Sequence, residues 1–179
     1  MKTIRIKDLL AKYQDGCRDF RGVSLKGANL FDCNLQNVNL EGSDLSNVYF
    51  CYAKLGRVNL NDATLEASNL SSTILHSAQL QRANLQHCNL HQASLYAADL
   101  QQANLVKANL YTADLRQANC NGAKFHRANL QHATLDQASF IGADLRGCDL
   151  WRAKGADLSG AFIDHTTILP DGHRGDRKA

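Results

Sequence analysis

A strict five-residue register runs through most of this chain. Every position divisible by five from 20 to 150 holds Leu, Phe or a single Cys, so that 27 consecutive positions carry 22 Leu, four Phe and Cys120. Two residues before each of these central positions stands a small side chain, which is Ala in 16 of the 27 cases. Arg18, at the start of the series, is the one large exception. The fold must therefore place every fifth residue in the same environment.

The five-residue period excludes both ordinary secondary structures over this stretch. In an α-helix, five residues turn through roughly 140° beyond a full circle, which distributes the leucines around the circumference without a buried stripe. In a flat strand, an odd period sends successive leucines to opposite faces, so half of them would meet water on a one-sided sheet. The remaining solution runs extended, turns a corner and repeats every five residues. Such a chain winds into a solenoid whose coils stack into a continuous core.

Residues outside the central positions indicate how many corners close one coil. Four of the glycines that follow a central residue share one place in a 20-residue frame, namely Gly22, Gly42, Gly122 and Gly142. A set of asparagines shares another place in the same frame: Asn29, Asn69, Asn89, Asn109 and Asn129. The frame predicts four pentapeptides per coil, with glycines at corners where φ is positive.

These motifs resemble the pentapeptide-repeat family, whose pattern is A-(D/N)-L-x-x. The pattern stands here as Ala28-Asn29-Leu30, Ala83-Asn84-Leu85, Ala98-Asp99-Leu100, Ala108-Asn109-Leu110, Ala113-Asp114-Leu115 and Ala143-Asp144-Leu145. The resemblance implies an all-β fold, a right-handed quadrilateral β-helix in which the central residue and the small residue two before it point inward. The other three residues of each repeat would face solvent. The opening, from Leu9 to Phe20, is similar to that of short cyanobacterial members.

The two ends of the repeat predict the domain limits. Leu9, Leu10 and Tyr13 have helical spacing in residues 6–14, and Gly16 is placed to stop a helix, so we expect residues 1–16 to form an N-terminal cap. The β-helix is expected over residues 17–169. After Ala153 the register jumps by three residues and resumes at positions 158, 163 and 168. Pro170 should end pairing because it has no N–H to donate, leaving 170–179 as a flexible tail.

The composition gives little support to catalysis, metal binding or a cofactor. The six cysteines show no C-x-x-C spacing and are expected to be reduced thiols. No histidine meets another histidine or an acid 20 residues further on, and no phosphate-binding glycine loop is present. No secretory signal or apolar run of membrane length is found, so a cytoplasmic location is expected.

Charges predict stacked ion pairs instead of a catalytic centre. Three pairs of opposite sign are separated by one coil, which are Asp62 with Arg82, Lys124 with Asp144, and Arg116 with Asp136. His76 and Tyr96 continue the column of Arg116, where the guanidinium is expected over the Tyr96 ring. Surface pairs of this kind contribute at most about 1 kcal/mol each.

The net charge of the chain is relevant to two possible functions, DNA mimicry and DNA binding. Some members of the resembled family protect DNA gyrase and are thought to mimic duplex DNA with a strongly acidic surface. This chain carries a net charge of +3, which disfavours such a mimic, although a topoisomerase-directed role stays open as the alternative. Direct nucleic-acid binding is not expected, because the basic residues form no long stripe. One secondary basic patch is predicted as a candidate anion contact: His87, Lys107, His126, Arg127 and Arg146.

The strongest candidate site lies where the register is loosest. Aromatic and basic residues gather there, and we expect all of the following to point outward: Phe31, Tyr49, Cys51, Tyr52, Lys54 and Arg57. Tyr111 and Trp151 extend the same column. Clustered aromatic and Arg side chains are typical of protein-binding hot spots. The alternatives are that the N-terminal cap covers Phe31 or that the rings only stabilise the stack.

The sequence therefore predicts a non-catalytic, rigid scaffold for protein–protein interaction, with a regulatory role and an unidentified protein partner. A membrane partner is not expected. Apolar residues near the C-terminus either cover the last coil or join two chains, so the chain is a monomer or a homodimer through that end: Phe162, Ile163 and Ile168.

Overall fold

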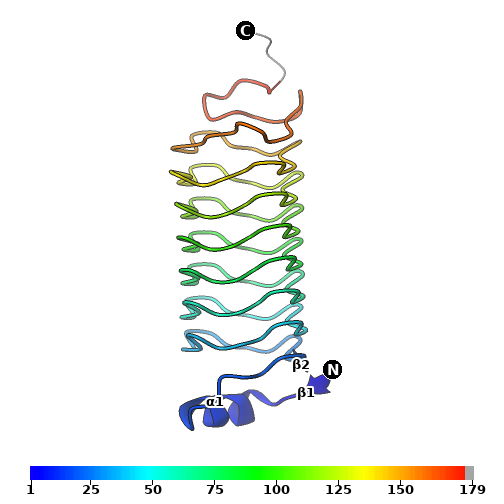
Figure 1. Ribbon diagram of the computed structural model, residues 1–179, viewed down its shortest axis with the longest axis vertical. Helices are drawn as coiled ribbons and strands as arrows, with labels where there is room; N and C mark the ends of the chain where they lie inside the picture. The colour runs from blue at the N-terminus through cyan, green and yellow to red at the C-terminus, as the bar shows by residue number, and fades with distance from the viewer. Residues whose placement is uncertain (176–179) are drawn as a thin grey trace.

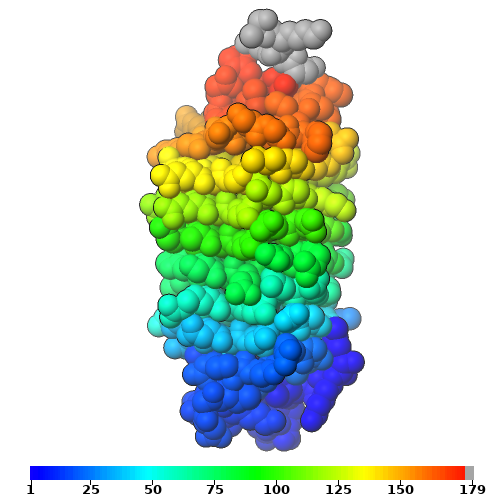
Figure 2. Space-filling model, in the orientation of Figure 1, coloured from blue at the N-terminus to red at the C-terminus, as the bar shows by residue number. Residues whose placement is uncertain are grey.

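The chain forms an elongated stack of coils, with its N-terminal residues at one pole and the last described residues at the opposite pole (Figure 1). The computed structural model describes residues 1–175. Parallel bridges join residues 20 apart along the stack, from Asp19 with Asn39 to Thr134 with Lys154. The predicted 20-residue coil is therefore confirmed. The space-filling view shows successive coils in close contact along the visible face (Figure 2).

Each pentapeptide is held by hydrogen bonds to the coils on both sides. The N–H of Leu90 donates to the carbonyl of Asn109 over 2.7 Å, and the N–H of Asn89 donates in the other direction to the carbonyl of Ser68 over 2.9 Å. A tight turn follows, in which Ala93 donates to the carbonyl of Leu90. Gln92 stands at this corner with a φ of +57°. Glycine occupies the same kind of corner at Gly42, with a φ of +62°, as the sequence predicted.

Long strands are not part of this repeat β-helix. Two short strands form in the described residues, β1 (Lys2–Thr3) and β2 (Val23–Ser24), and they pair in parallel. Elsewhere the coils are joined by isolated single-residue bridges. The expectation of an all-β chain therefore holds in the form of bridges repeated from coil to coil, because each extended stretch is only two or three residues long before the next turn.

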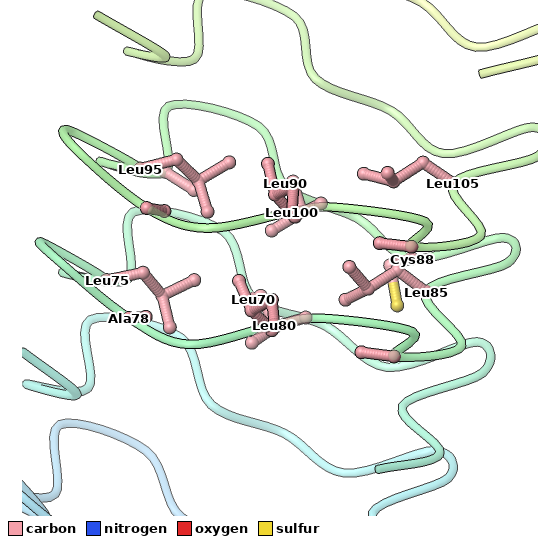
Figure 3. Packing of buried hydrophobic residues seen from close by; sticks show 14 of the residues in the cluster. Leu70, Leu75, Ala78, Leu80, Leu85, Cys88, Leu90, Leu95, Leu100 and Leu105 are labelled. Carbon is pink, nitrogen blue, oxygen red and sulfur yellow. The ribbon is translucent and has the colours of Figure 1, made fainter. Parts of the chain in front are cut away.

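The core is a column of central side chains. None of the central positions from 20 to 150 is more than 4% exposed. Figure 3 shows Leu70, Leu75 and Leu80 in one coil, with Leu90, Leu95 and Leu100 in the next. The small residues two before them, which are Ser68, Thr73, Ala78, Cys88, Ala93 and Ala98, are buried beside them. The inward pair predicted for each repeat is confirmed over these coils.

Polar residues at the inward small positions find backbone partners. The hydroxyl of Ser68 donates to the carbonyl of Leu45 over 2.7 Å, and the hydroxyl of Thr73 donates to the carbonyl of Phe50 over 2.8 Å. No buried side-chain N or O atom among the described residues lacks a hydrogen bond. Polar replacements of Ala are therefore tolerated because a carbonyl of the coil beneath is within reach.

The N-terminal residues cover the first coil. Helix α1 (Ile6–Gln14) buries Leu9 completely. Gly16, with a φ of +92°, donates to the carbonyl of Tyr13, and Cys17 donates to the carbonyl of Lys12. These two bonds are those of a Schellman motif, in which a left-handed glycine ends the helix. The predicted helix over residues 6–14 and its stop at Gly16 are confirmed.

The last coil leaves the regular frame twice. Phe162 pairs with Asp144, a separation of 18 residues, and Ile168 pairs with Asp149, a separation of 19. Thr167 is fully buried and takes the inward small position, so Leu169 takes the central one. The prediction that Ile168 continues the frame of position 163 is wrong, because one extra residue is accommodated in the turn between these bridges.

The chain also pairs beyond Pro170. Ile168 and Arg174 form an antiparallel bridge, and Leu169 donates to the carbonyl of His173 over 2.7 Å. Pro170 has no N–H, but its carbonyl accepts from Arg152 over 2.9 Å. The prediction that pairing ends at Pro170 is therefore wrong for residues 170–175. The remainder of the predicted tail, residues 176–179, lies outside the described residues.

Candidate functional site: an exposed aromatic cluster

Three aromatic side chains of the predicted site lie together on the outside of the stack. The ring centroids of Phe31 and Tyr49 are 6.1 Å apart with nearly parallel planes, and those of Phe31 and Tyr52 are 5.7 Å apart edge to face. Phe31 is 53% exposed, Tyr49 40% and Tyr52 57%. We call these three residues the aromatic cluster. Their mutual contacts fix the rings while more than a third of each residue remains in contact with solvent.

Backbone pairing sets the position of the cluster. Tyr49 donates to the carbonyl of Ala28 over 2.9 Å, and Asn29 bridges with Tyr49 in parallel. Tyr52 occupies a corner with a φ of +61°, a conformation that directs its side chain away from the axis. The rings are thus carried by backbone that is hydrogen-bonded to neighbouring coils, so little ordering entropy remains to be lost when they meet a partner.

Cys51 does not belong to the exposed site. It is 2% exposed, and its Sγ lies 3.0 Å from the hydroxyl oxygen of Ser71 in the next coil. The prediction that Cys51 points outward is wrong, because its short side chain turns along the stack toward Ser71 between two larger tyrosines. Its interaction with Tyr49 raises the pKa of that phenol. Cys51 therefore supports the cluster from beneath.

The two basic residues of the predicted site are exposed, but Arg57 is held at another corner. Its Nε donates to the Asn37 side chain over 2.8 Å. Lys54 bridges with Asn34 through the backbone and is also exposed. Among the described residues, neither makes a hydrogen bond or ion pair with the aromatic cluster. The structure thus brings together the three rings and leaves the two cations at the margin.

A hollow of about 450 Å³ adjoins the cluster. It is lined by residues of α1 and of the first coils, namely Leu10, Tyr13, Gln14, Phe31, Cys33 and Asn34. The guanidinium of Arg18 lies 3.9 Å above the Tyr13 ring. Burial raises the pKa of the Cys33 thiol to about 12, so it is neutral at this wall. The cap therefore approaches Phe31 without covering it, contrary to one of the alternatives.

A second aromatic series lies further along the stack. His91 and Tyr111 stack with centroids 5.6 Å apart, Tyr111 meets His132 at 5.4 Å, and His132 meets Trp151 at 5.3 Å. The guanidinium of Arg152 lies 4.2 Å from the Trp151 ring. The sequence identified Tyr111 and Trp151, but not the link through His132. His132 is 21 residues after Tyr111 and 19 residues before Trp151, so a search for residues exactly 20 apart does not find this link.

Most arginine–aspartate pairs form within a repeat instead of between coils. Arg116 pairs with Asp114 and Arg146 pairs with Asp144, with N–O distances of 2.8 Å in both cases. The expected pairs of Arg116 with Asp136 and of Lys124 with Asp144 are therefore wrong as ion pairs. A carboxylate two residues away on the same turn is nearer than one in the next coil.

One predicted stacked pair does form. Arg82 pairs with Asp62 across one coil at 2.6 Å. The Arg116 guanidinium also lies 5.7 Å from the Tyr96 ring, and His76 meets that ring edge to face, as the ladder predicted.

The secondary basic patch is weaker than its composition suggests. His87, Lys107, Arg127 and Arg146 are exposed, and His126 is half-buried. Both Arg146 nitrogens that face Asp144 donate to its carboxylate, which offsets the arginine charge and lowers the pKa of that carboxyl. An anion would therefore compete with Asp144 for Arg146.

Residues 1–175 contain no cluster of metal-binding side chains. No group of three or more His, Cys, Asp or Glu side chains in that range is arranged to hold a metal ion. All six cysteines are free thiols. Helix α1, the single helix in the described range, is too short to cross a membrane.

Solved structures similar to this chain are pentapeptide-repeat proteins and a resistance protein. HetL, from the cyanobacterium Nostoc sp. strain PCC 7120 and involved in heterocyst differentiation regulation, is 26% identical over 96% of this chain and 99% of that chain, with a TM-score of 0.32. Rfr23, from the cyanobacterium Cyanothece 51142, is 25% identical over 92% of this chain and 99% of that one, with a TM-score of 0.32. QnrB1, a plasmid-mediated fluoroquinolone resistance protein, is 16% identical over 84% of this chain and 91% of that one, with a TM-score of 0.42.

No curated protein matches the chain. A family model described as pentapeptide repeats matches it in overlapping segments, at residues 19–47, 28–66, 43–78, 53–92, 73–110, 93–131 and 113–152. These segments cover the coils that carry the aromatic cluster and the second aromatic series. The chain belongs to the pentapeptide-repeat family.

Proposed function

We propose that this protein is a non-catalytic scaffold that binds a protein partner through the aromatic cluster. The observation that carries the proposal is the exposure of Phe31, Tyr49 and Tyr52 on a stack whose central side chains are buried. Large aromatic residues that stay in solvent beside a rigid core are enriched at protein–protein hot spots. The adjoining hollow adds a concave surface in which a side chain of the partner would fit.

The proposal extends to the shape and state of the scaffold. We propose a right-handed quadrilateral β-helix, which is supported by the four inward central residues and the four turns in each 20-residue coil. A monomer or a homodimer through the C-terminal end is proposed as before, because Phe162 is 61% exposed there. A cytoplasmic location agrees with six cysteines kept as thiols.

The alternative of a DNA mimic that acts on a topoisomerase has less support. A mimic needs an acidic surface, whereas the chain carries a net charge of +3. The arginine–aspartate pairs also place cations directly beside carboxylates, as at Arg116 and Arg146. A supercoiling assay with purified gyrase tests this alternative, and unchanged activity at saturating protein removes it.

The test of the proposed function removes the cluster without removing the coils. A Tyr49→Ala/Tyr52→Ala variant is compared with Tyr96→Ala, which removes a tyrosine from a different column. Loss of the two ring pairs with Phe31 costs about 0.5 to 1.5 kcal/mol each, so the circular dichroism spectrum should match wild type while the urea midpoint falls modestly. We expect capture of a partner from native-cell lysate to be lost only in the double variant. Undiminished capture by that variant would refute the proposal.

A further inference from the structure

A backbone edge near the C-terminal end is left open on one side of the stack. In the regular coil before it, Gln117 donates to the carbonyl of Asp136, Cys120 donates to the carbonyl of Ser139, and Ser139 donates to the carbonyl of Ala118. These three bonds have lengths of 2.9, 2.8 and 3.0 Å. The same pattern of two donors and one acceptor recurs in each regular coil beneath, so this side of the solenoid is normally fully paired.

One coil further on, this pattern has no partner in the described part of the chain. The N–H groups of Gln137 and Phe140 have no acceptor there, and the carbonyl of Ala138 has no donor. We call residues 137–140 the open edge. Three unpaired polar groups in the order donor, acceptor, donor form a template for an added strand.

The cause is a shortened path of the last coil. Lys154 pairs with Thr134 and Phe162 pairs with Asp144. The last coil therefore covers with eight residues the distance that the coil before it covers with ten. The intervening segment returns to the stack at Gly160, whose carbonyl accepts from Gly142 over 2.7 Å. This segment packs Ala156 and Leu158 against the core, but it is two residues short and forms no backbone hydrogen bond with the open edge.

A hollow of about 320 Å³ separates the open edge from that segment. Its walls come from both sides and are formed by Gln137, Ala138, Ser139, Phe140, Ile141, Asp157 and Ser159. Ile141 is 64% exposed at one end of it. Asp157 is the one charged residue in the lining, and hydrogen bonds from Ser159 lower the pKa of its carboxyl, which is therefore an anion at neutral pH.

We propose that the open edge binds a short extended peptide of a partner protein, which adds to the stack as a parallel strand. Parallel addition follows from the orientation of the coil pairs from residue 19 to residue 168. A first peptide residue accepts a hydrogen bond from the N–H of Gln137 through its carbonyl. The peptide residue three positions later donates its N–H to the carbonyl of Ala138, and its own carbonyl accepts from the N–H of Phe140. Main-chain bonds of this type give affinity in β-strand addition, and side-chain pockets give specificity.

The walls of the hollow define the side chains that suit it. The residue after the second carbonyl corresponds to a central position of a regular coil, so it should be apolar and lie beside Phe140 at the wall of the hollow. A basic residue is favoured near Asp157, and an acidic one is disfavoured. The preferred ligand is therefore a basic, extended segment with one apolar anchor. This site is separate from the aromatic cluster and does not depend on it.

The natural probe is the segment that covers the same edge one coil earlier. Residues 136–140 have the sequence Asp-Gln-Ala-Ser-Phe, and the synthetic peptide Lys-Gln-Ala-Ser-Phe replaces the acid with a base. The control peptide carries a methyl group on the backbone nitrogen of its Ser. This group removes the N–H that would donate to Ala138 and leaves all side chains unchanged. Binding is measured by amide NMR shifts of the full-length protein.

We expect saturable shifts at the amides of Gln137 and Phe140, and about tenfold weaker binding of the N-methylated peptide. Ser159→Trp should block the hollow and abolish the shifts, whereas His165→Trp, at an exposed site, should leave them unchanged. Equal binding of the two peptides, or no saturable shift at millimolar concentration, overturns the proposal. Self-association that Ser159→Trp abolishes would also overturn it, because a second copy would then occupy the edge.

Discussion

Leu90→Ala removes three carbon atoms from a site that is 1% exposed. Leu70 lies in the same column one coil away (Figure 3). The amides of Leu70 and Leu90 each donate to the next coil over 2.7 Å, to Asn89 and Asn109. These repeated bonds hold the coils at a fixed spacing. The neighbouring side chains therefore cannot move far enough to fill the void.

The expected loss of stability has two parts. Transfer of three carbon atoms contributes about 2.4 kcal/mol, at about 0.8 kcal/mol for each. The unfilled cavity adds to this, and buried Leu→Ala substitutions cost about 2.7 to 5 kcal/mol in total. Because the coil spacing is fixed by backbone bonds, we expect a value in the upper half of that range, about 4 kcal/mol.

The assay is equilibrium urea unfolding followed by far-ultraviolet circular dichroism. Gln86→Ala is the matched control, because Gln86 stands directly after a central residue and is half-buried at the surface. It should change the free energy of unfolding by no more than about 0.5 kcal/mol. A cost below about 1 kcal/mol for Leu90→Ala, or an equal cost for both variants, would show that the column of central side chains is not the core.

Two further predictions concern titratable groups. Arg146 holds the folded-state pKa of Asp144 below its usual value, so their interaction stabilises the fold above about pH 4 and is lost as pH falls through the folded pKa. Asp144→Asn keeps an oxygen that accepts from the Arg146 N–H but removes the negative charge. Its urea midpoint should therefore lie below that of wild type at pH 7, and the difference should shrink toward pH 2, where Asp144 is protonated. A difference that stays constant with pH would contradict this. Burial raises the pKa of Cys88 and Cys148 to about 12, so a thiol reagent at pH 8 should modify Cys17 first and all six thiols only after unfolding. Rapid reaction at Cys88 in the native protein would contradict that order.

The five-residue register predicted the fold well because it determines which side chains point inward. A residue such as Leu90 or Ala93 is inward whatever its neighbours do, since the turn repeats every five residues. The helix at residues 6–14 was equally readable, because its apolar spacing and Gly16 are local signals. The coil length followed from glycines and asparagines at corners.

The side-chain contacts of the site were harder to predict. The column assigns Cys51 to the outside, but its short side chain lies along the stack against the Ser71 hydroxyl and is buried there. Arg116 and Arg146 pair with carboxylates in their own repeats, because an aspartate two residues away is nearer than one in the next coil. Such choices depend on side-chain geometry, which the register does not contain.

The open edge shows the same limit at the backbone level. The sequence revealed a register change after Ala153, but the bonds that are lost depend on the path of the shortened segment. Gln137 and Phe140 have ordinary sequence contexts. Their unpaired amides follow from the positions of the bridges at Lys154 and Phe162, which the sequence does not determine.

The central claim is that the backbone closes one coil every 20 residues and turns once in every five. Amide hydrogen exchange measured by NMR tests it most directly. Leu95 and Ala97 donate to carbonyls of the next coil, over 2.7 and 2.9 Å, whereas no described residue accepts from Tyr96 between them. We predict fast exchange at Tyr96 between two protected amides, and slow exchange at every central position from residue 20 to residue 135, because each of these central amides donates to the next coil. Protection at Tyr96 equal to that at Leu95 and Ala97, or fast exchange at the central amides, would contradict the account.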